Sequence, residues 1–592
     1  MRSKFGDNEP QDVSYHGNAF LRLMGYIKPY WKTVALCCVL VGLLTVFDIA
    51  RPRIIGDAID KYITQQSAQD LPPETRFQGI LIAAGLYVAI LLLQFICNRL
   101  QYLKIQETGQ NIVYTLRNEL MAHVESLSMR FFDLTPVGRI VTRITNDTEA
   151  VNDLYANTIV RLFRNVVKII GLAIIMMVMN FRMAMLSFVL VPVMAALTVE
   201  FRKLSRKTYQ IVKTRITTLN TFLSEHLSGM RVIQIFAREK EKCAEFEEKN
   251  ESLYRSGVRE MMVFAIFRPS IYFLSVIAMA IILGGGSALV LDGVISIGML
   301  YTFTEYISQL FTPVQELAEQ FTTLQSAIAS AEKIFTLLDE KPMLSDKEDA
   351  KKLPAVRGKI EFDHVWFAYD NVNWVLKDVS FTIEPGQKVA FVGATGAGKS
   401  SILNLIGRYY DVQKGSIRVD GVDVRDLTRD QLRAAIGQVQ QDVFIFTGDI
   451  KSNIRLRDEE ITDEQVHRAA EYTNASRFIE RLPNGYDEHV TERGATFSAG
   501  QRQLLSFART LAHDPKILIL DEATANIDTE TEQWIQEALE RLMQGRTSIM
   551  VAHRLSTIQH ADRIIVMHHG QIRESGTHQE LLKQDGIYKK LY

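Results

Sequence analysis

Apolar residues are concentrated in the first half of the chain, where they form long runs separated by polar segments. Six runs come near the roughly 20 residues with which a helix crosses a bilayer. We expect them at residues 33–56, 78–98, 158–180, 184–201, 262–290 and 296–312. Some runs contain polar residues, but Val34–Val46 and Ile271–Ile282 carry no charge, which argues against core helices of a soluble protein. The pattern therefore predicts an all-α membrane domain with six spans.

The connections between these spans differ in length and in positive charge. Segments 99–157 and 202–261 are long and rich in Lys and Arg, whereas Asn180–Arg182 is a tight turn and Gly284–Gly298 carries no Lys or Arg. The positive-inside rule then places the long connections and both termini of a multi-pass protein on the cytosolic side of the cytoplasmic membrane. The long connections lack Pro/Gly-rich linkers, so we expect the spanning helices to continue into the cytosol. Residues 18–31 read as an amphipathic elbow at the membrane surface.

The pattern changes after residue 340. A polar linker is followed by KIEFDHVWFAY, which alternates as a strand does, and then by a strand (Gln387–Val392), a glycine loop and a helix (Lys399–Tyr409). This order is typical of an α/β domain. The expected parts are 1–31, the cytosolic N-terminus and elbow; 32–340, the transmembrane domain with two long cytosolic loops; 341–357, the linker; and 358–592, the α/β domain.

The charge, the cysteine content and the N-terminal sequence of the chain argue against some classes of function and support others. The chain has 592 residues, 47% of them hydrophobic, and a formal net charge of −1, so bulk charge gives no indication of nucleic-acid binding. Its four cysteines show neither metal spacing nor a disulfide framework, as in a reduced, cytosol-facing protein. The N-terminus has no cleavable signal pattern, so the first span is expected to serve as the insertion signal.

The glycine loop has the composition of a phosphate-binding loop. Residues Gly393–Ser401 read GATGAGKSS and fit the pattern G-x-x-x-x-G-K-[ST]. Glycines let backbone N–H groups wrap around phosphates, Lys399 neutralises phosphate charge, and Ser400 can ligate Mg²⁺. The strand before the loop and the helix after it are the context that this chemistry needs.

More than a hundred residues later, ILILDEAT combines a buried strand with two adjacent carboxylates. Phosphoryl transfer to water needs charge neutralisation at the β/γ-phosphates and a positioned nucleophile. Asp521 suits the outer shell of a magnesium ion, and Glu522 suits a general base or a water-orienting group. His553 is placed to hydrogen-bond the γ-phosphate. Together with the glycine loop, these residues predict binding and hydrolysis of a nucleoside triphosphate.

Further motifs follow in a recognisable order. FSAGQRQLLSFAR occupies 497–509, ahead of the Asp521 strand, and the preceding TERGATFSAGQ segment contains Glu492. With these motifs the chain resembles the ABC exporters over about residues 18–592. The resemblance implies a multidomain fold, in which an all-α six-helix transmembrane domain like that of type I ABC exporters precedes an α/β P-loop nucleotide-binding domain with a RecA-like core and a helical subdomain.

The resemblance also implies a role for each matching residue. Tyr369 is similar to the A-loop aromatic that stacks on adenine, Gln441 to the Q-loop glutamine that senses Mg²⁺ and the nucleophilic water, and Asp528 to the D-loop aspartate. His553 is similar to the switch histidine. The catalytic set is then Glu522, His553 and Gln441. The ATP-binding set is Tyr369, Gly393, Thr395, Gly396, Gly398, Lys399, Ser400, Ser401, Asp521, Ser498, Gly500, Gln501 and Asp528. The magnesium set is Ser400, Gln441 and, in the outer shell, Asp521.

The segment FSAGQRQLLSFAR resembles the signature motif of this family, and its sequence bears on which partner subunit the chain has. In this family the signature caps ATP held by a second subunit, so the chain is expected to dimerise as a half-transporter. The usual sequence is LSGGQ, and here Phe497 and Ala499 depart from it while Glu522 is intact. That combination resembles one subunit of the heterodimeric multidrug exporters, with a non-identical partner whose catalytic carboxylate is degenerate. A homodimer that tolerates FSAGQ stays open.

The expected function is ATP-driven export of hydrophobic or amphipathic compounds such as drugs and lipids. A lipid flippase and a peptide exporter remain alternatives. The spans exclude a soluble ABC protein, and fusion of the spans to the ATPase domain argues against an importer. In the last span, Glu305 and Gln309 share one helix face with Thr312 and Glu316 and are candidates for a substrate cavity. Structural pairing between helices is an equally good interpretation of such polar residues, including Asp48, Arg51, Gln94 and Asn98.

Two cytosolic segments resemble the coupling regions of exporters. The first, 131–151, is expected to touch a nucleotide-binding domain around Phe132 to Gly138. The second, 221–239, is expected to dock into the partner around Ser228 to Val232.

Overall fold

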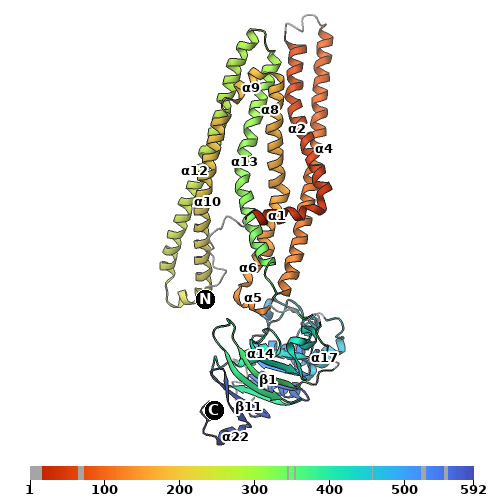
Figure 1. The fold of residues 1–592 in the computed structure, drawn as a ribbon, viewed down its shortest axis with the longest axis vertical. Helices are drawn as coiled ribbons and strands as arrows, with labels where there is room; N and C mark the ends of the chain where they lie inside the picture. Colours follow the sequence, from red (N-terminus) through yellow and green to blue (C-terminus); the bar gives the residue numbers. More distant parts are fainter. Residues whose placement is uncertain are drawn as a thin grey trace. The chain divides into compact units, whose positions relative to one another are not determined.

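The computed structural model describes residues 16–64, 72–342, 346–347, 349–352, 355–456, 458–521, 529–551 and 558–591. They belong to two compact units (Figure 1). The helical unit comprises Met1–Glu125 and Pro136–Glu340, and the α/β unit comprises Ser126–Thr135 and Lys341–Tyr592. A short piece of the long connection after the second predicted span therefore belongs to the α/β unit.

The helical unit consists of long helices joined by short breaks (Figure 1). Its main helices are α1 (His16–Ile27), α2 (Trp31–Ala58), α4 (Pro73–Ser126), α8 (Ile159–Met179), α9 (Phe181–Phe188), α10 (Val191–Ser228), α12 (Glu239–Leu291) and α13 (Ile297–Leu338). Between α4 and α8 lie α6 (Val137–Thr142), α7 (Thr148–Asp153) and the π-helical turns η3 (Arg143–Asp147) and η4 (Leu154–Thr158), and α11 (Met230–Ile235) links α10 to α12.

In the part of the chain that the structure describes, five helical stretches are long and apolar enough to cross a membrane. They are Ala19–Ile63, Pro73–Ser126, Val137–Met179, Phe181–Ser228 and Glu239–Leu291. These stretches contain the first, second, fourth and fifth predicted spans, and all of the third except Asn180. The sixth predicted span lies in α13, which is less apolar and packs against α2, α8, α10 and α12. Large apolar side chains such as Ile82, Leu92 and Phe95 of α4 are more than half exposed, as expected for helices solvated by lipid.

The helices continue well beyond the predicted spans, as the sequence indicated. At 1.5 Å per residue, the 54 residues of α4 extend for about 80 Å, far more than the bilayer core of about 30 Å. Likewise α12, with 53 residues, begins at Glu239, inside the predicted connection 202–261. Short helices such as α6 and α11 break the two long connections, so each connection is helical but not one continuous helix.

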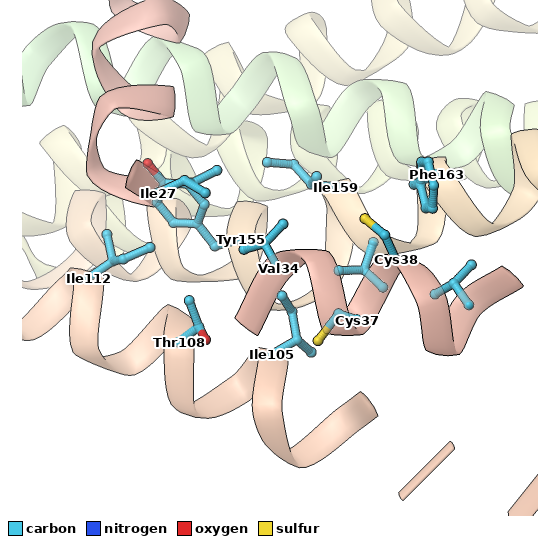
Figure 2. Close-up of a pocket in the computed structure, with 12 residues that line it drawn as sticks. Ile27, Val34, Cys37, Cys38, Ile105, Thr108, Ile112, Tyr155, Ile159 and Phe163 are labelled. Atoms are coloured by element: carbon cyan, nitrogen blue, oxygen red, sulfur yellow. The ribbon is translucent and has the colours of Figure 1, made fainter. Parts of the chain in front are cut away.

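The elbow α1 is held by polar contacts and faces an apolar pocket. The Tyr155 hydroxyl donates to the Leu23 carbonyl at 2.6 Å, and the Tyr26 hydroxyl donates to the Glu119 carboxylate at 2.6 Å. Figure 2 shows the pocket, about 130 Å³ in volume, which is lined by residues of α1, α2, α4, η4 and α8. Its hydroxyl groups, from Thr108 and Tyr155, already bond to backbone carbonyls. The rest of the pocket lining is mostly apolar, and Ile27 is the residue of α1 that contributes to it.

The α/β unit is built on a six-stranded sheet of order β12-β11-β3-β10-β9-β6. Its strands are β3 (Lys388–Val392), β6 (Ile436–Val439), β9 (Ile517–Asp521), β10 (Thr547–Val551), β11 (Arg563–His568) and β12 (Gln571–Gly576). A four-stranded antiparallel sheet has the order β2-β1-β4-β5, from β1 (Ile360–Phe367), β2 (Leu376–Ile383), β4 (Lys414–Val419) and β5 (Val422–Asp423). β7 (Gly448–Asp449) pairs with β8 (His489–Val490).

Helices complete this unit. They are α5 (Met129–Leu134), α14 (Lys399–Ile406), α15 (Arg429–Ala434), α16 (Ile450–Arg455), α17 (Asp463–Tyr472), α18 (Ser476–Ile479), α19 (Ala499–Ala512), α20 (Thr529–Met543), α22 (His578–Lys583) and α23 (Ile587–Leu591). The α/β class expected for the second half of the chain is thus observed.

The central strands of the six-stranded sheet are parallel and buried on both faces. β10 pairs in parallel with β3 and β9, and Val551 is the register partner of both Phe391 and Asp521. Continuous Val/Ile/Leu runs are typical of such strands. Because the carboxyl ends of parallel strands meet at one edge, the loop after β3 and the carboxylate that ends β9 share that edge, with β10 between them.

We predict that Thr462→Ala weakens the first turn of α17. The Thr462 hydroxyl accepts from the backbone N–H of Gln465 at 3.3 Å, and the Gln465 side chain accepts from the N–H of Thr462 at 2.8 Å. Loss of such a cap costs about 1 kcal/mol, roughly a fivefold loss of protection in hydrogen–deuterium exchange. Thr462→Ser keeps the oxygen and serves as the control. Equal exchange in the two variants would show that the cap does not stabilise this helix.

Candidate functional site

The phosphate loop lies between β3 and α14 and requires its glycines for steric reasons. A Cβ atom on Gly393 would lie 2.2 Å from the Met567 carbonyl oxygen, which no side chain tolerates. Gly398 has φ of 101°, in the region that favours glycine, and a Cβ there would lie 2.8 Å from the Leu376 side chain. Gly396 also has a positive φ, of 81°. The loop can therefore fold tightly enough to turn its backbone N–H groups inward.

Lys399 is held inside this loop. Its side chain is buried, and its Nζ donates to the carbonyl oxygens of Gly393 at 2.6 Å and Ala394 at 3.1 Å. An ammonium group bonds more strongly to phosphate than to a neutral carbonyl. The lysine is thus already at the position where it would neutralise a bound phosphate. Ser400 and Ser401 follow it in the first turn of α14, where helix geometry also favours an anion.

Tyr369 lies beside the loop. Its hydroxyl is 3.0 Å from the Ser401 hydroxyl, and Asn404 donates to it at 3.4 Å. Its ring meets the rings of Phe367 and Tyr410 edge-on, with centroids 4.7 and 5.0 Å away, yet it remains 37% exposed. An exposed aromatic ring at this position can stack on a base whose phosphates occupy the loop.

The structure describes only some of the other residues that are predicted to bind or hydrolyse the nucleotide. Asp521 ends β9, and Gln441 is exposed in the segment after β6, whose Val439 is the register partner of Leu520. Because β6 and β9 are parallel, these two residues lie at the same sheet edge. Glu522, Asp528 and His553 lie outside the described residues, so their roles remain predictions.

The signature segment caps α19. The Ser498 hydroxyl accepts from the Gln501 backbone N–H at 3.2 Å, and the Gln501 side chain accepts from the Ser498 N–H at 2.9 Å. The two departures from the family pattern differ in position. Phe497 is buried and packs against Phe478, so it belongs to the core, whereas Ala499 is exposed at the helix start. Of these two side chains, only that of Ala499 is therefore exposed at the surface that the signature segment presents.

The first residues of the first coupling segment, in α5, are part of the α/β unit and contact it there. The Tyr410 hydroxyl donates to the carboxylate of Asp133 in α5, and the Tyr410 ring meets the Tyr369 ring at 88°. Burial, followed by the bond to Asp133, raises the pKa of Tyr410. In the second segment, Val232 and Ile235 are exposed in this chain. Its docking to a partner remains a prediction.

Polar residues of the predicted spans form interhelical contacts. Asn165 donates to Glu316 at 3.0 Å, and Gln94 donates to Asp48 at 2.8 Å. Glu305 and Gln309 lie half-buried on α13, and their assignment to a cavity remains a prediction. Sequence reasoning missed Lys168, whose Nζ lies 3.3 Å from Asp48. A lysine within an apolar span was the signal that could have found it.

Comparisons with known proteins agree with this geometry. The model of the ABC transporter transmembrane region matches residues 34–314, and that of the ABC transporter domain matches residues 376–525. The chain is 38% identical to a probable multidrug resistance ABC transporter ATP-binding/permease protein, YheH, of Bacillus subtilis, over 93% of this chain and 81% of that one. It is 33% identical to an ATP-dependent lipid A-core flippase of Syntrophus aciditrophicus, over 100% and 95% of the two chains.

A solved structure extends the likeness to the whole fold. A bacterial Atm1-family ABC exporter with ATP bound superposes with a TM-score of 0.80 at 27% identity, covering 95% of this chain and 98% of that one. Its helical and α/β parts correspond to those found here. The chain therefore belongs to the ABC transporter family, as an exporter-type half-transporter and multi-pass membrane protein whose ATPase domain is coupled to export.

Proposed function

We propose that this chain exports amphipathic compounds across the bacterial cytoplasmic membrane by alternating access, as one half of a dimer with both termini in the cytosol. The observation that carries the proposal is the shared sheet edge of the phosphate loop and Asp521, in a chain that also holds five lipid-compatible helical stretches. The relatives named as exporters and flippases support the same assignment. The working division of the chain is elbow 1–31, transmembrane domain 32–340, linker 341–357 and ATPase domain 358–592.

In the proposed ATP site, each residue has a distinct task. Tyr369 stacks on adenine, while Lys399 and the loop N–H groups hold the phosphates. Ser400 and Gln441 would supply the hard oxygen ligands that suit Mg²⁺, and Asp521 would lie in the outer shell of the ion. Bound Mg²⁺ supplies charge neutralisation at the β/γ-phosphates. Glu522 orients the attacking water and takes its proton, and His553 hydrogen-bonds the γ-phosphate.

The signature geometry supports a second, non-identical subunit. Ser498 and the N–H groups that begin α19 form an anion-favouring surface that, by the family's arrangement, covers the partner's ATP. The exposed Ala499 methyl group weakens close approach of phosphate there. The productive site is then built from Lys399 and Glu522 of this chain and the partner's intact signature. A homodimer is the alternative.

A lipid flippase is the second candidate, because one relative carries that name and the architecture is the same. The two activities separate by assay. Reconstituted complex that takes up fluorescent amphipathic drugs with ATP, but does not flip labelled lipids, is an exporter of foreign compounds. The reverse result identifies a flippase. A peptide exporter would respond to neither probe.

We predict that Glu522→Gln abolishes ATPase activity of the complex, because the nucleophilic water loses its base at the one productive site. Released phosphate measures turnover, and removal of an essential base costs at least about 100-fold. Glu492→Gln, outside the proposed catalytic set, is the control. Substantial turnover remaining in the Glu522 variant would contradict the asymmetric heterodimer.

A second prediction concerns coupling. Asp133→Asn and Tyr410→Phe should each reduce stimulation of ATPase activity by transported compounds while the unstimulated rate is retained, because each weakens or removes the Tyr410–Asp133 contact. Tyr409→Phe removes a neighbouring hydroxyl, which bonds to Gln438 at 3.2 Å, and is the matched control.

The double variant decides whether the two residues act together. If they do, its stimulation equals that of either single variant. Full stimulation in both single variants would show that this contact does not transmit substrate binding.

A further inference from the structure

A charged cluster joins three helices of the helical unit within the predicted spans. Asp48 and Arg51 lie on α2, Gln94 on α4 and Lys168 on α8. Asp48 accepts from Gln94 at 2.8 Å, its other oxygen lies 3.3 Å from the Lys168 ammonium, and the Arg51 guanidinium is 3.4 Å away. Ionised side chains are costly in the hydrocarbon region and usually serve a pathway or a binding site.

Positive charge exceeds negative charge in this cluster. Within the described part of the chain, Asp48 is the one carboxylate that pairs with either Lys168 or Arg51. Both ionic contacts are longer than the roughly 2.7–2.9 Å of a good charge-assisted hydrogen bond. Among described groups, Arg51 Nε and Gln94 Oε1 are buried and have no hydrogen-bond partner. One carboxylate shared between two cations leaves the cluster one positive charge in excess.

The charged side chains of Lys168 and Arg51 are partly exposed, so a ligand from outside the cluster can reach them. The side chains of Lys168 and Arg51 keep 17% and 26% of their exposure, against 10% for Asp48. Lys168 also continues a row on α8, because Arg164 and Arg161 precede it by four and seven residues and so lie on the same helix face. Both arginines are exposed, and no described residue forms an ion pair with them. This row forms a positive track leading to the cluster.

We infer that Lys168 and Arg51 bind the anionic group of the exported amphiphile, a phosphate, sulfonate or carboxylate, while its apolar part stays among the hydrophobic side chains of the spans. The inference rests on the proposed export function and specifies its substrate class. An anion there neutralises the excess charge in a medium where electrostatic attraction is strong. A neutral or cationic amphiphile of the same size lacks this gain.

The alternative role of the cluster is to hold α2, α4 and α8 together. The two roles predict opposite effects for one substitution. Asp48→Asn removes the carboxylate that competes for the cations, so it should tighten anion binding, whereas a merely structural cluster would be weakened by it. Lys168→Gln should weaken anion binding, and Lys168→Arg should preserve it.

The test uses the full complex in nanodiscs of zwitterionic lipid. Photo-crosslinking compares a diazirine-tailed alkyl phosphate with the tail-matched alkyl trimethylammonium probe. The phosphate probe should label α2 and α8 preferentially. Lys168→Gln should lower its apparent affinity about tenfold, the effect of losing one charge-assisted hydrogen bond, and Asp48→Asn should raise it. Arg182→Gln removes an exposed cation of α9, just beyond the end of α8, and should change neither the labelling nor the affinity of the phosphate probe.

The outcomes separate the inference from the proposed function. Equal labelling by both probes, or loss of affinity in both the Asp48 and Lys168 variants, overturns the anion site even if the complex still exports drugs with ATP. Lack of any ATP-driven export overturns the proposed function instead. Adding anionic phospholipid to the nanodiscs distinguishes the source of the ligand: competition with the phosphate probe identifies a membrane lipid, and its absence a foreign amphiphile.

Discussion

The parallel register of β3, β10 and β9 is the constraint on which the ATP chemistry depends. It fixes Phe391, Val551 and Asp521 side by side, so that the phosphate loop and the acidic strand end lie at one edge although more than a hundred residues separate them. The buried Val/Ile/Leu runs of these strands leave no alternative face to expose. Around this edge, the glycine loop folds closely enough to hold Lys399 inside it.

A chain of aromatic and polar contacts connects this edge with the membrane half of the sequence. Tyr369, at the proposed adenine site, meets the ring of Tyr410, whose hydroxyl bonds to Asp133 in α5. The helix α5 comes from the connection between two spans but belongs to the α/β unit. Direct contacts thus link Tyr369 to Asp133 within the α/β unit.

The helical unit is constrained by the bilayer and not by the register of a sheet. Hydrocarbon offers no hydrogen bonds to the backbone, so its spans must be helical, and their side chains face lipid or each other. Some polar groups in or next to the spans are paired, as Asn165 is with Glu316, whereas the cluster around Asp48 carries unbalanced charge. That imbalance is what distinguishes a candidate ligand site from a simple contact between helices.

The sequence by itself determined the two-part architecture, the first five spans and the phosphate loop, because these depend on local composition and on short motifs. It also identified Asp48, Arg51 and Gln94 as polar residues within spans, but it left open whether they pair or line a cavity. Only the tertiary structure showed that Lys168 joins them, that Phe497 is a core residue while Ala499 is exposed, and that Tyr410 reaches Asp133. These facts depend on which faces of distant elements meet, and the spacing of residues along one chain does not specify that.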